Sequence, residues 1–253
     1  MHLLHLPDEV LRLIFSHVPA SALLTRCQYV CKRWHDILSS QAFWKFKYME
    51  DWPHFGSHKM AISTVCNWKK ICLKDPFRRN LIKNPCGEDS WNSWRVHNGG
   101  DGWSFIRFTS EDLPHVCSAF GSSFHWSVKS QTIDLIEEGL CKKVLDEYQP
   151  EIAISDWYSA YIPWGGEYKM TAKLLGHNQR QVIQEFHTEG LIPGNQPEQC
   201  WVQVQHVFTD YGTGVRYVKF QHMAKDILYW KGHYGAWVTN SSVTVRLRTA
   251  PQK

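Results

Sequence analysis

Apolar residues recur at helical spacing through the first fifty residues of the chain, two to a turn. In the first run they are Val10, Leu11, Ile14, Phe15 and Val18. This run predicts a helix over 8–18. Asp8 and Glu9 favour its start, because carboxylates interact well with the positive end of a helix dipole, and Pro19 closes it.

A second helical pattern follows, and Ser21 is expected to cap it. Its apolar positions are Leu23, Leu24, Cys27, Val30, Cys31, Trp34, Ile37 and Leu38. Phe43, Trp44 and Phe46 then begin another short helix. A unit of this size has too little interior to bury all these side chains. The remaining apolar face therefore either binds a partner or packs on the following domain, and the pattern leaves both alternatives open.

Residues 49–80 form a connector with a helical run near Val65 to Leu73. It carries a cluster of basic residues, which are Lys69, Lys70, Lys74, Arg78, Arg79 and Lys83. A charge run of this kind is usually a solvated surface, and that is the interpretation we adopt.

From Leu81 onward the pattern changes to period-two alternation broken by turn signals, most clearly in Trp201 to Phe208. The other expected strands are 91–96, 103–108, 124–128, 151–157, 168–175, 181–187, 215–220 and 243–247, with one short helix at 134–147. Many short strands joined by turns predict an antiparallel β-sandwich. We therefore expect an α+β multidomain chain, divided at 1–48, 49–80 and 81–253.

Composition narrows the range of functions. The chain has 253 residues, of which 43% are hydrophobic and 14% aromatic, and 13 are tryptophan. A net charge of +4 is too small to predict nucleic-acid binding. No run approaches the roughly 18 apolar residues of a membrane span, and the first residues lack the basic region of a signal peptide. The eight cysteines form no CxxC pair, so we expect reduced thiols and a cytoplasmic protein.

Motifs for catalysis are missing from the sequence. It contains no GxSxG, P-loop, GxGxxG after a strand, or HExxH. Cys27, Cys31 and His35 would share one helical face, but three ligands on a single helix make a poor zinc geometry, so packing is the expected role. We expect no catalytic residue, no metal and no cofactor.

A segment with binding chemistry lies between two expected strands, at Tyr229-Trp230-Lys231-Gly232-His233-Tyr234-Gly235. Aromatic faces suit the C–H face of a sugar, lysine and the indole N–H donate to hydroxyls, and glycine allows close approach. A second aromatic loop, 157–166, could line the same rim, and Phe124 could form a further wall. The alternative is an aromatic cluster that merely closes one end of the sandwich.

Two regions resemble known families. Leu6-Pro7, Trp34 and Phe43-Trp44 are similar to an F-box. Residues from about Arg79 to Leu247 resemble the F-box-associated domain of the sugar-recognising F-box proteins, which are related to the nonspecific cytotoxic cell receptor proteins. The motifs that carry this second resemblance are Arg79 to Glu88, Gly99 to Trp103, Ser122 to Trp126, Asp156 to Ser159, Phe208 to Arg216, Tyr229 to Gly232 and Val238 to Val243.

The resemblance implies a three-helix F-box followed by a ten-stranded antiparallel sandwich of the galactose-binding-like jelly-roll type. It implies that the F-box binds a Skp-type adaptor, and through it cullin and RING subunits of a ubiquitin ligase. The implied adaptor-binding residues are Leu6, Pro7, Leu11, Ile14 and Phe15.

In the glycan-binding members, the associated domain captures the inner chitobiose of high-mannose N-glycans on misfolded glycoproteins returned from the endoplasmic reticulum. The implied glycan-binding residues are Phe124, Tyr229, Trp230 and Lys231. The resemblance thus implies a non-catalytic receptor subunit in the cytoplasm, at the cytosolic face of the endoplasmic reticulum.

The sequence departs from the glycan-binding pattern in two places. An acidic residue expected after Asp156-Trp157-Tyr158-Ser159 is replaced by Tyr161-Ile162-Pro163-Trp164, and the segment 103–120 is shorter. Loss of a carboxylate acceptor would cost roughly 1.5–3 kcal/mol, or about tenfold or more in affinity. The alternative function is therefore recognition of a non-glycan protein ligand, without a ligase role.

Overall fold

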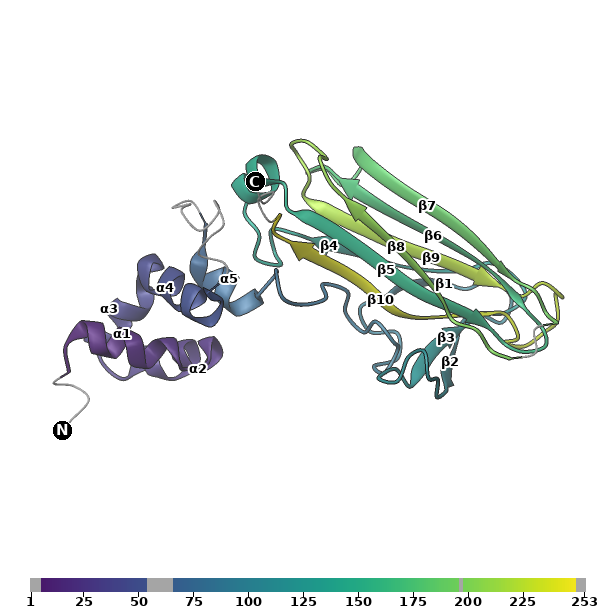
Figure 1. Cartoon of the computed structure of the whole chain (residues 1–253), viewed down its shortest axis with the longest axis horizontal. Helices are drawn as coiled ribbons and strands as arrows, with labels where there is room; N and C mark the ends of the chain where they lie inside the picture. Colours follow the sequence, from purple (N-terminus) through teal and green to yellow (C-terminus); the bar gives the residue numbers. More distant parts are fainter. Residues whose placement is uncertain (1–5, 54–65, 196–197, 249–253) are drawn as a thin grey trace.

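The computed structural model describes residues 6–53, 66–195 and 198–248. Short helices precede two β-sheets in this part of the chain (Figure 1). We call residues 6–53 the helical module. Its elements are α1 (Asp8–Ser16), α2 (Ala20–Thr25), the 3-10 helix η2 (Cys27–Tyr29), α3 (Lys32–Ser39) and α4 (Gln41–Asp51).

Large aromatic side chains hold the helical module together. The Phe15 ring meets the edges of Trp34 and Phe43, with centroids 4.9 and 6.4 Å apart. Trp44 is fully buried, and its indole N–H donates to the Leu38 carbonyl at 2.7 Å. A few bulky residues thus fill the small interior, since burial of each removes a large apolar area from water.

The second helical pattern forms three elements instead of one continuous helix. α2 begins at Ala20 behind Pro19, so Ser21 lies inside the helix and the predicted cap is wrong. Cys27 lies on η2, Cys31 precedes α3, and His35 lies within α3. The expectation that these three share one helical face is also wrong, because the backbone turns away from helical geometry at Arg26.

The connector reaches the sandwich through helix α5 (Trp68–Lys74), whose first turn is capped by the Asn67 side chain. Val65 lies outside the described residues. The basic cluster is not simply solvated, because Lys70 lies 3.3 Å from Glu137, and Arg79 pairs with Glu138. Both carboxylates belong to the sandwich side, so these charges help to attach the connector to it.

Ten strands form two antiparallel sheets of five strands each within the described residues, so the predicted sandwich is confirmed. One sheet has the order β1-β4-β9-β6-β7 and the other β2-β3-β10-β5-β8. The bounds are β1 Arg95–His97, β2 Ser104–Arg107, β3 Ser118–Gly121, β4 Ser127–Asp134, β5 Glu151–Ala160, β6 Gly166–Leu175, β7 Val182–Ile192, β8 Val202–Phe208, β9 Tyr217–Lys225 and β10 Ala236–Arg246.

Strand β4 and the expected helix 134–147 differ from the sequence prediction. Strand β4 begins at Ser127, so Phe124 lies in the preceding loop, where the Ser123 carbonyl accepts the Asp226 N–H at 2.9 Å. The expected helix 134–147 is instead a turn followed by the π-helix Val144–Tyr148. Its start is lost because the Asp134 carboxylate accepts the N–H groups of Ile136 and Glu137, which holds the backbone in a turn.

A polar cluster lies buried between the two sheets. The Asp156 carboxylate accepts hydrogen bonds from Tyr168 and His222 at 2.6 Å and from Ser241 at 2.8 Å. The Lys129 Nζ has no hydrogen-bond partner among the described residues and lies 3.6 Å from the Trp94 ring centroid. We call Lys129, Asp156, Tyr168, His222 and Ser241 the buried polar cluster.

Burial dominates the electrostatics of this cluster. Desolvation lowers the pKa of Lys129 well below its usual value, although the Asp156 carboxylate opposes the shift. Desolvation, reinforced by the Lys129 charge, lowers the pKa of His222 to about 4. His222 is therefore neutral at physiological pH and donates its Nδ1 proton to Asp156.

Candidate functional site

Four loops converge at the end of the sandwich that lies far from the helical module (Figure 1). They are the segments 98–103, 122–126, 161–165 and 226–235, which we call the loop cluster. Strand register brings them together, since Ala236 pairs with Ala160, and Ser127 pairs with Ala224. The sequence-predicted glycan residues all lie on two of these loops.

Asp226 fixes the path of the loop between β9 and β10. It is fully buried, and its carboxylate accepts the N–H groups of Leu228, Tyr229 and Trp230 at 3.1, 2.6 and 3.2 Å. Further along, the Gly232 N–H donates to the Asp101 carboxylate at 2.7 Å. These hydrogen bonds fix the backbone of the loop, so the Cα positions of residues 229–231 are defined by the fold.

Trp230 lies at the surface and is 50% exposed. Its ring is tilted against Trp164, with centroids 5.0 Å apart, and Trp164 in turn lies 6.0 Å from Tyr234. The two aromatic loops of the sequence therefore meet, and Trp230 does not turn into the sandwich core. An exposed, supported indole of this kind offers both a stacking face and an N–H donor.

Tyr229 and Phe124 are linked through His125. The His125 ring lies 4.8 Å from the Phe124 centroid and 6.3 Å from the Tyr229 centroid. The Tyr229 hydroxyl accepts from the Lys225 ammonium at 3.2 Å, while Lys231 is exposed. The structure thus gathers all four predicted residues at one end of the sandwich, although Phe124 and Trp230 belong to different aromatic groups.

Sequence reasoning missed Asp226, Asp101 and His125 as parts of this site. Asp226 directly follows a strand, which is a common place for an Asx-type turn, but that signal does not predict three accepted N–H bonds. Asp101 lies in the glycine-rich turn 98–102, more than a hundred residues from the loop it supports. Only the fold brings them together.

The five expected adaptor residues divide into two groups. Leu11 and Phe15 are 0% and 3% exposed, so they form the interior of the helical module. Pro7 is exposed, Leu6 is half-buried and Ile14 is 37% exposed, so these three can meet a partner.

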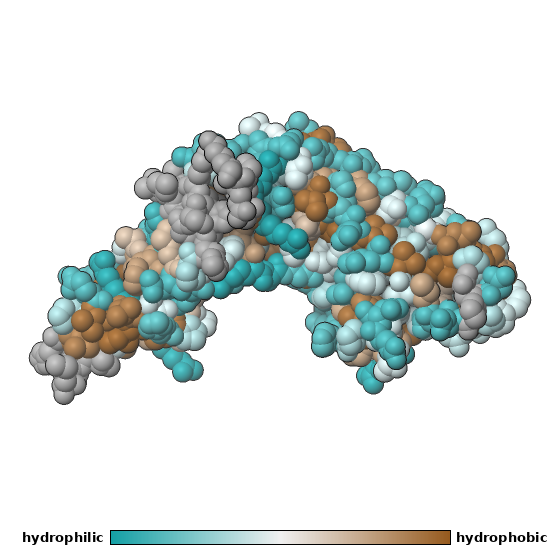
Figure 2. Space-filling model, in the orientation of Figure 1, coloured by the Kyte–Doolittle hydropathy of each residue, from teal (hydrophilic) through white to brown (hydrophobic). Residues whose placement is uncertain are grey.

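Several more apolar side chains are exposed on the module, namely Val10, Leu13, Tyr29 and Val30. Figure 2 shows hydrophobic residues gathered on the end of the helical module that lies away from the sandwich. The apolar face of the module therefore remains largely uncovered by the sandwich. Contiguous exposed apolar surface of this kind is typical of a protein-binding face.

Within residues 6–53, 66–195 and 198–248, no group of three or more His, Cys, Asp or Glu side chains could hold a metal ion. Likewise, none of the helices in this part of the chain is long and apolar enough to cross a membrane.

Comparison with known proteins supports the two-part organisation. The family model described as "F-box associated region" matches residues 72–245, and the one described as "F-box-like" matches residues 3–50. A solved carbohydrate-binding module in complex with β-1,4-galactotriose is 14% identical with a TM-score of 0.43, covering 67% of this chain and 99% of that one. That likeness is too distant to bear on function.

Curated relatives align with nearly the whole chain. Human F-box only protein 17 is 37% identical, over 96% of this chain and 92% of that protein. Bovine F-box only protein 2 is 36% identical, over 95% and 82%, and mouse F-box only protein 27 is 37% identical, over 98% and 92%. The chain therefore belongs to the F-box proteins that carry an F-box associated region.

Proposed function

We propose that this chain is the non-catalytic substrate-recognition subunit of an SCF-type ubiquitin ligase. The helical module binds a Skp-type adaptor and, through it, cullin and RING subunits. The loop cluster binds the chitobiose core of high-mannose N-glycans on misfolded glycoproteins, which are then ubiquitinated for ER-associated degradation. The protein acts in the cytoplasm, at the cytosolic face of the endoplasmic reticulum.

One observation supports the sugar-binding part above the others: the half-exposed Trp230 on a backbone held by the buried Asp226 carboxylate. A pre-ordered loop loses little conformational entropy when a ligand binds. The indole face can pack on the sugar ring, and Lys231 and the Tyr229 hydroxyl can hydrogen-bond with hydroxyl or acetamido groups.

The ligase part is supported by the apolar surface of the helical module. Ile14, Leu6 and Pro7 are the predicted adaptor residues that reach this surface, and Leu11 and Phe15 support them from inside. The two binding surfaces lie at opposite ends of the molecule (Figure 1). Such a tether raises the effective concentration of a client near the ubiquitin carrier, while the covalent chemistry takes place on other subunits.

Calorimetry with chitobiose and a glycan array tests the sugar-binding part. Trp230→Ala should weaken chitobiose binding by about tenfold or more, because it removes the exposed stacking face. Tyr29→Ala, which removes a more exposed ring from the helical module, is the matched control and should bind as the wild type does. Equal binding by wild type and Trp230→Ala would refute the sugar assignment.

Adaptor binding is tested separately by pull-down with a purified Skp-type adaptor. Ile14→Glu places a charge on the apolar surface and should reduce binding by about thirtyfold or more. Leu191→Glu, at a 63% exposed position on the sandwich, should leave adaptor binding unchanged. Retention of full binding by Ile14→Glu would contradict the ligase part alone.

Recognition of a non-glycan protein ligand is the second candidate. It is favoured by Tyr161 and Trp164, which occupy the loop where the glycan-binding pattern has an acidic residue. Tyr161 is 43% exposed and the nearby Leu228 is 39% exposed, so the rim offers apolar surface to a protein. Client capture that survives removal of N-glycans with a glycosidase would favour this candidate.

A further inference from the structure

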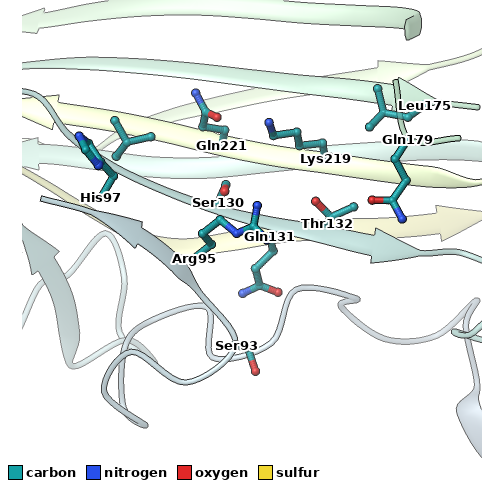
Figure 3. Close-up of a pocket in the computed structure, with 11 residues that line it drawn as sticks. Ser93, Arg95, His97, Ser130, Gln131, Thr132, Leu175, Gln179, Lys219 and Gln221 are labelled. Atoms are coloured by element: carbon teal, nitrogen blue, oxygen red, sulfur yellow. The ribbon is translucent and has the colours of Figure 1, made fainter. Parts of the chain in front are cut away.

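A polar groove of about 600 Å³ lies on the outer face of the sheet β1-β4-β9-β6-β7, and its lining includes none of the four predicted glycan-binding residues. Strand β1 contributes Arg95 and His97 to its lining, and β9 contributes Lys219 and Gln221. Between them, β4 contributes hydroxyl side chains. Figure 3 shows these side chains projecting over the sheet from the three strands.

Strand register places the lining residues in two adjacent rows. Arg95 pairs with Ser130, and Ser130 pairs with Gln221 on the next strand. Two residues along β4, Thr132 pairs with Lys219. Neighbouring strands are about 4.8 Å apart, so the guanidinium of β1 and the ammonium of β9 flank the hydroxyls of β4.

Charge on this sheet face is arranged unevenly. On β6, Lys169 pairs with Glu189 at 2.8 Å, and Lys173 pairs with Glu185 at 3.0 Å. In the groove, Arg95 and Lys219 form no ion pair with any described residue, and no acidic residue contributes to the lining. The β6 lysines are thus neutralised within the sheet, whereas the groove keeps two uncompensated positive charges.

The remaining lining chemistry selects against apolar ligands. No Phe, Tyr or Trp side chain lines the groove, so it lacks a large stacking platform for a neutral sugar. The side chains of Ser130, Thr132 and Gln221 make no hydrogen bond with other described residues, so their donors and acceptors face the groove unused. The site therefore suits a ligand that combines a compact anion with several hydroxyl groups.

We propose that this groove binds the phosphate monoester of a small polyhydroxylated compound, that is, a sugar phosphate. The Arg95 guanidinium can bind two phosphate oxygens at once, and the Lys219 ammonium adds a second positive charge. Ser130, Thr132 and Gln221 hydrogen-bond with the sugar hydroxyls. A cavity of this volume has room for a monosaccharide phosphate. The site is separate from the glycan site and does not depend on it.

The test is titration of the full chain with glucose 6-phosphate at low salt, followed by calorimetry and by amide NMR shifts. Glucose 6-phosphate should bind at least about tenfold more tightly than inorganic phosphate or glucose, because its phosphate contacts the two cations and its hydroxyls contact the neutral polar side chains. Arg95→Gln and Lys219→Gln should each weaken binding by about tenfold, and the shifts should map to β1, β4 and β9.

Lys169→Gln is the matched control, because it removes a lysine of the same face that already has a carboxylate partner and is not the cross-strand neighbour of Lys219. It should change the affinity by less than about twofold. Equal weakening by Lys169→Gln and Lys219→Gln would show non-specific attraction and would overturn the proposal. Binding of inorganic phosphate as tight as that of glucose 6-phosphate would overturn sugar recognition, and tighter binding of O-phosphoserine would assign the groove to phosphorylated protein instead.

Discussion

The helical module and the sandwich differ in the kind of side chain that each buries and that each leaves exposed. The module fills its interior with Leu11, Phe15 and Trp44 but leaves apolar side chains such as Leu13 and Val30 exposed. The sandwich encloses charged and polar groups such as Lys129 and Asp156 between its sheets. Apolar side chains left outside a small module are typical of a protein-binding face, whereas polar groups enclosed between two sheets favour one specific packing of the sheets.

The largest expected effect comes from breaking the buried polar cluster. Asp156→Ala removes the shared acceptor of Tyr168, His222 and Ser241 and leaves Lys129 without its carboxylate. We expect the free energy of unfolding of the sandwich to fall by about 4 kcal/mol, because three buried donors lose their hydrogen-bond acceptor and Lys129 loses the opposing carboxylate charge. Urea unfolding followed by hydrogen-exchange mass spectrometry measures this loss peptide by peptide.

The control for that variant is Asp8→Ala in the helical module. Asp8 pairs with Arg33 at 2.6 Å, but the two side chains are 48% and 38% exposed. An exposed ion pair contributes at most about 1 kcal/mol. If Asp156→Ala cost no more than Asp8→Ala, the contrast between the two regions would be wrong.

A pH series should show, without mutation, that the stability of the sandwich depends on its buried polar cluster and that the helical module lacks this dependence. Burial lowers the pKa of His222 from 6.5 to about 4, so the unfolded chain binds a proton in this window and the folded one does not. Stability of the sandwich should therefore be complete above pH 6.5 and should fall as the pH drops to about 4. At about 1.4 kcal/mol per pKa unit, the loss is about 3 kcal/mol.

His222→Gln, compared with wild type over the same pH range, isolates this contribution. Its stability should be lower at pH 7 but should change less between pH 6.5 and 4. An unchanged slope in the variant would mean that other groups produce the acid sensitivity. Peptides of the helical module should show little of this effect, because His222 lies in the sandwich.

The smallest expected effect is that of a disulfide between the connector and the sandwich. The sulfur atoms of Cys66 and Cys141 lie 3.0 Å apart, and a hydrogen bond from Cys66, with backbone N–H groups of Val144 and Lys143, lowers the pKa of Cys141 to about 6. Oxidised glutathione should join them: Cys141 thiolate attacks it and releases one glutathione, then Cys66 displaces the second.

Peptide mapping under denaturing conditions measures this link as a pair of peptides that has lost two hydrogens. The exposed Cys200 provides the comparison, because it should form only a mixed disulfide with glutathione. Hydrogen exchange should slow slightly in α5 and remain unchanged in α1. Absence of the link under conditions that modify Cys200 would contradict the observed proximity of the two sulfur atoms.

Regular alternation was the part of the fold that sequence could predict. The strand at Val202–Phe208 follows from its period-two pattern, and the connection of Tyr229 to Lys231 between two strands follows from its turn residues. The start of β4 did not follow, because its inward residues Ser127, Lys129 and Gln131 are as polar as its outward ones. The pattern of apolar and polar residues therefore does not show which side chains of β4 point inward. The predicted strand, 124–128, begins three residues before the observed one.

The candidate site was predictable only in its side chains. Aromatic and basic residues at 229–231 indicate binding chemistry in any context, and Phe124 is expected as a further wall both from its side chain and from the family resemblance. The groups that hold the loop in place, Asp226 and Asp101, depend on strand pairing across the sandwich, which no local pattern contains. The same limit applies to the buried polar cluster, whose members come from five different strands.

The hydrogen bonds accepted by Asp226 make the backbone path of the loop 226–235 independent of its exposed side chains. Because they involve only main-chain N–H groups, substitution of Tyr229, Trp230 or Lys231 leaves the anchoring intact. New ligand preferences could therefore arise by single mutations at these three positions, without redesign of the supporting architecture. The surface chemistry of this end of the sandwich can thus change while the Asp226 carboxylate keeps the loop backbone in place.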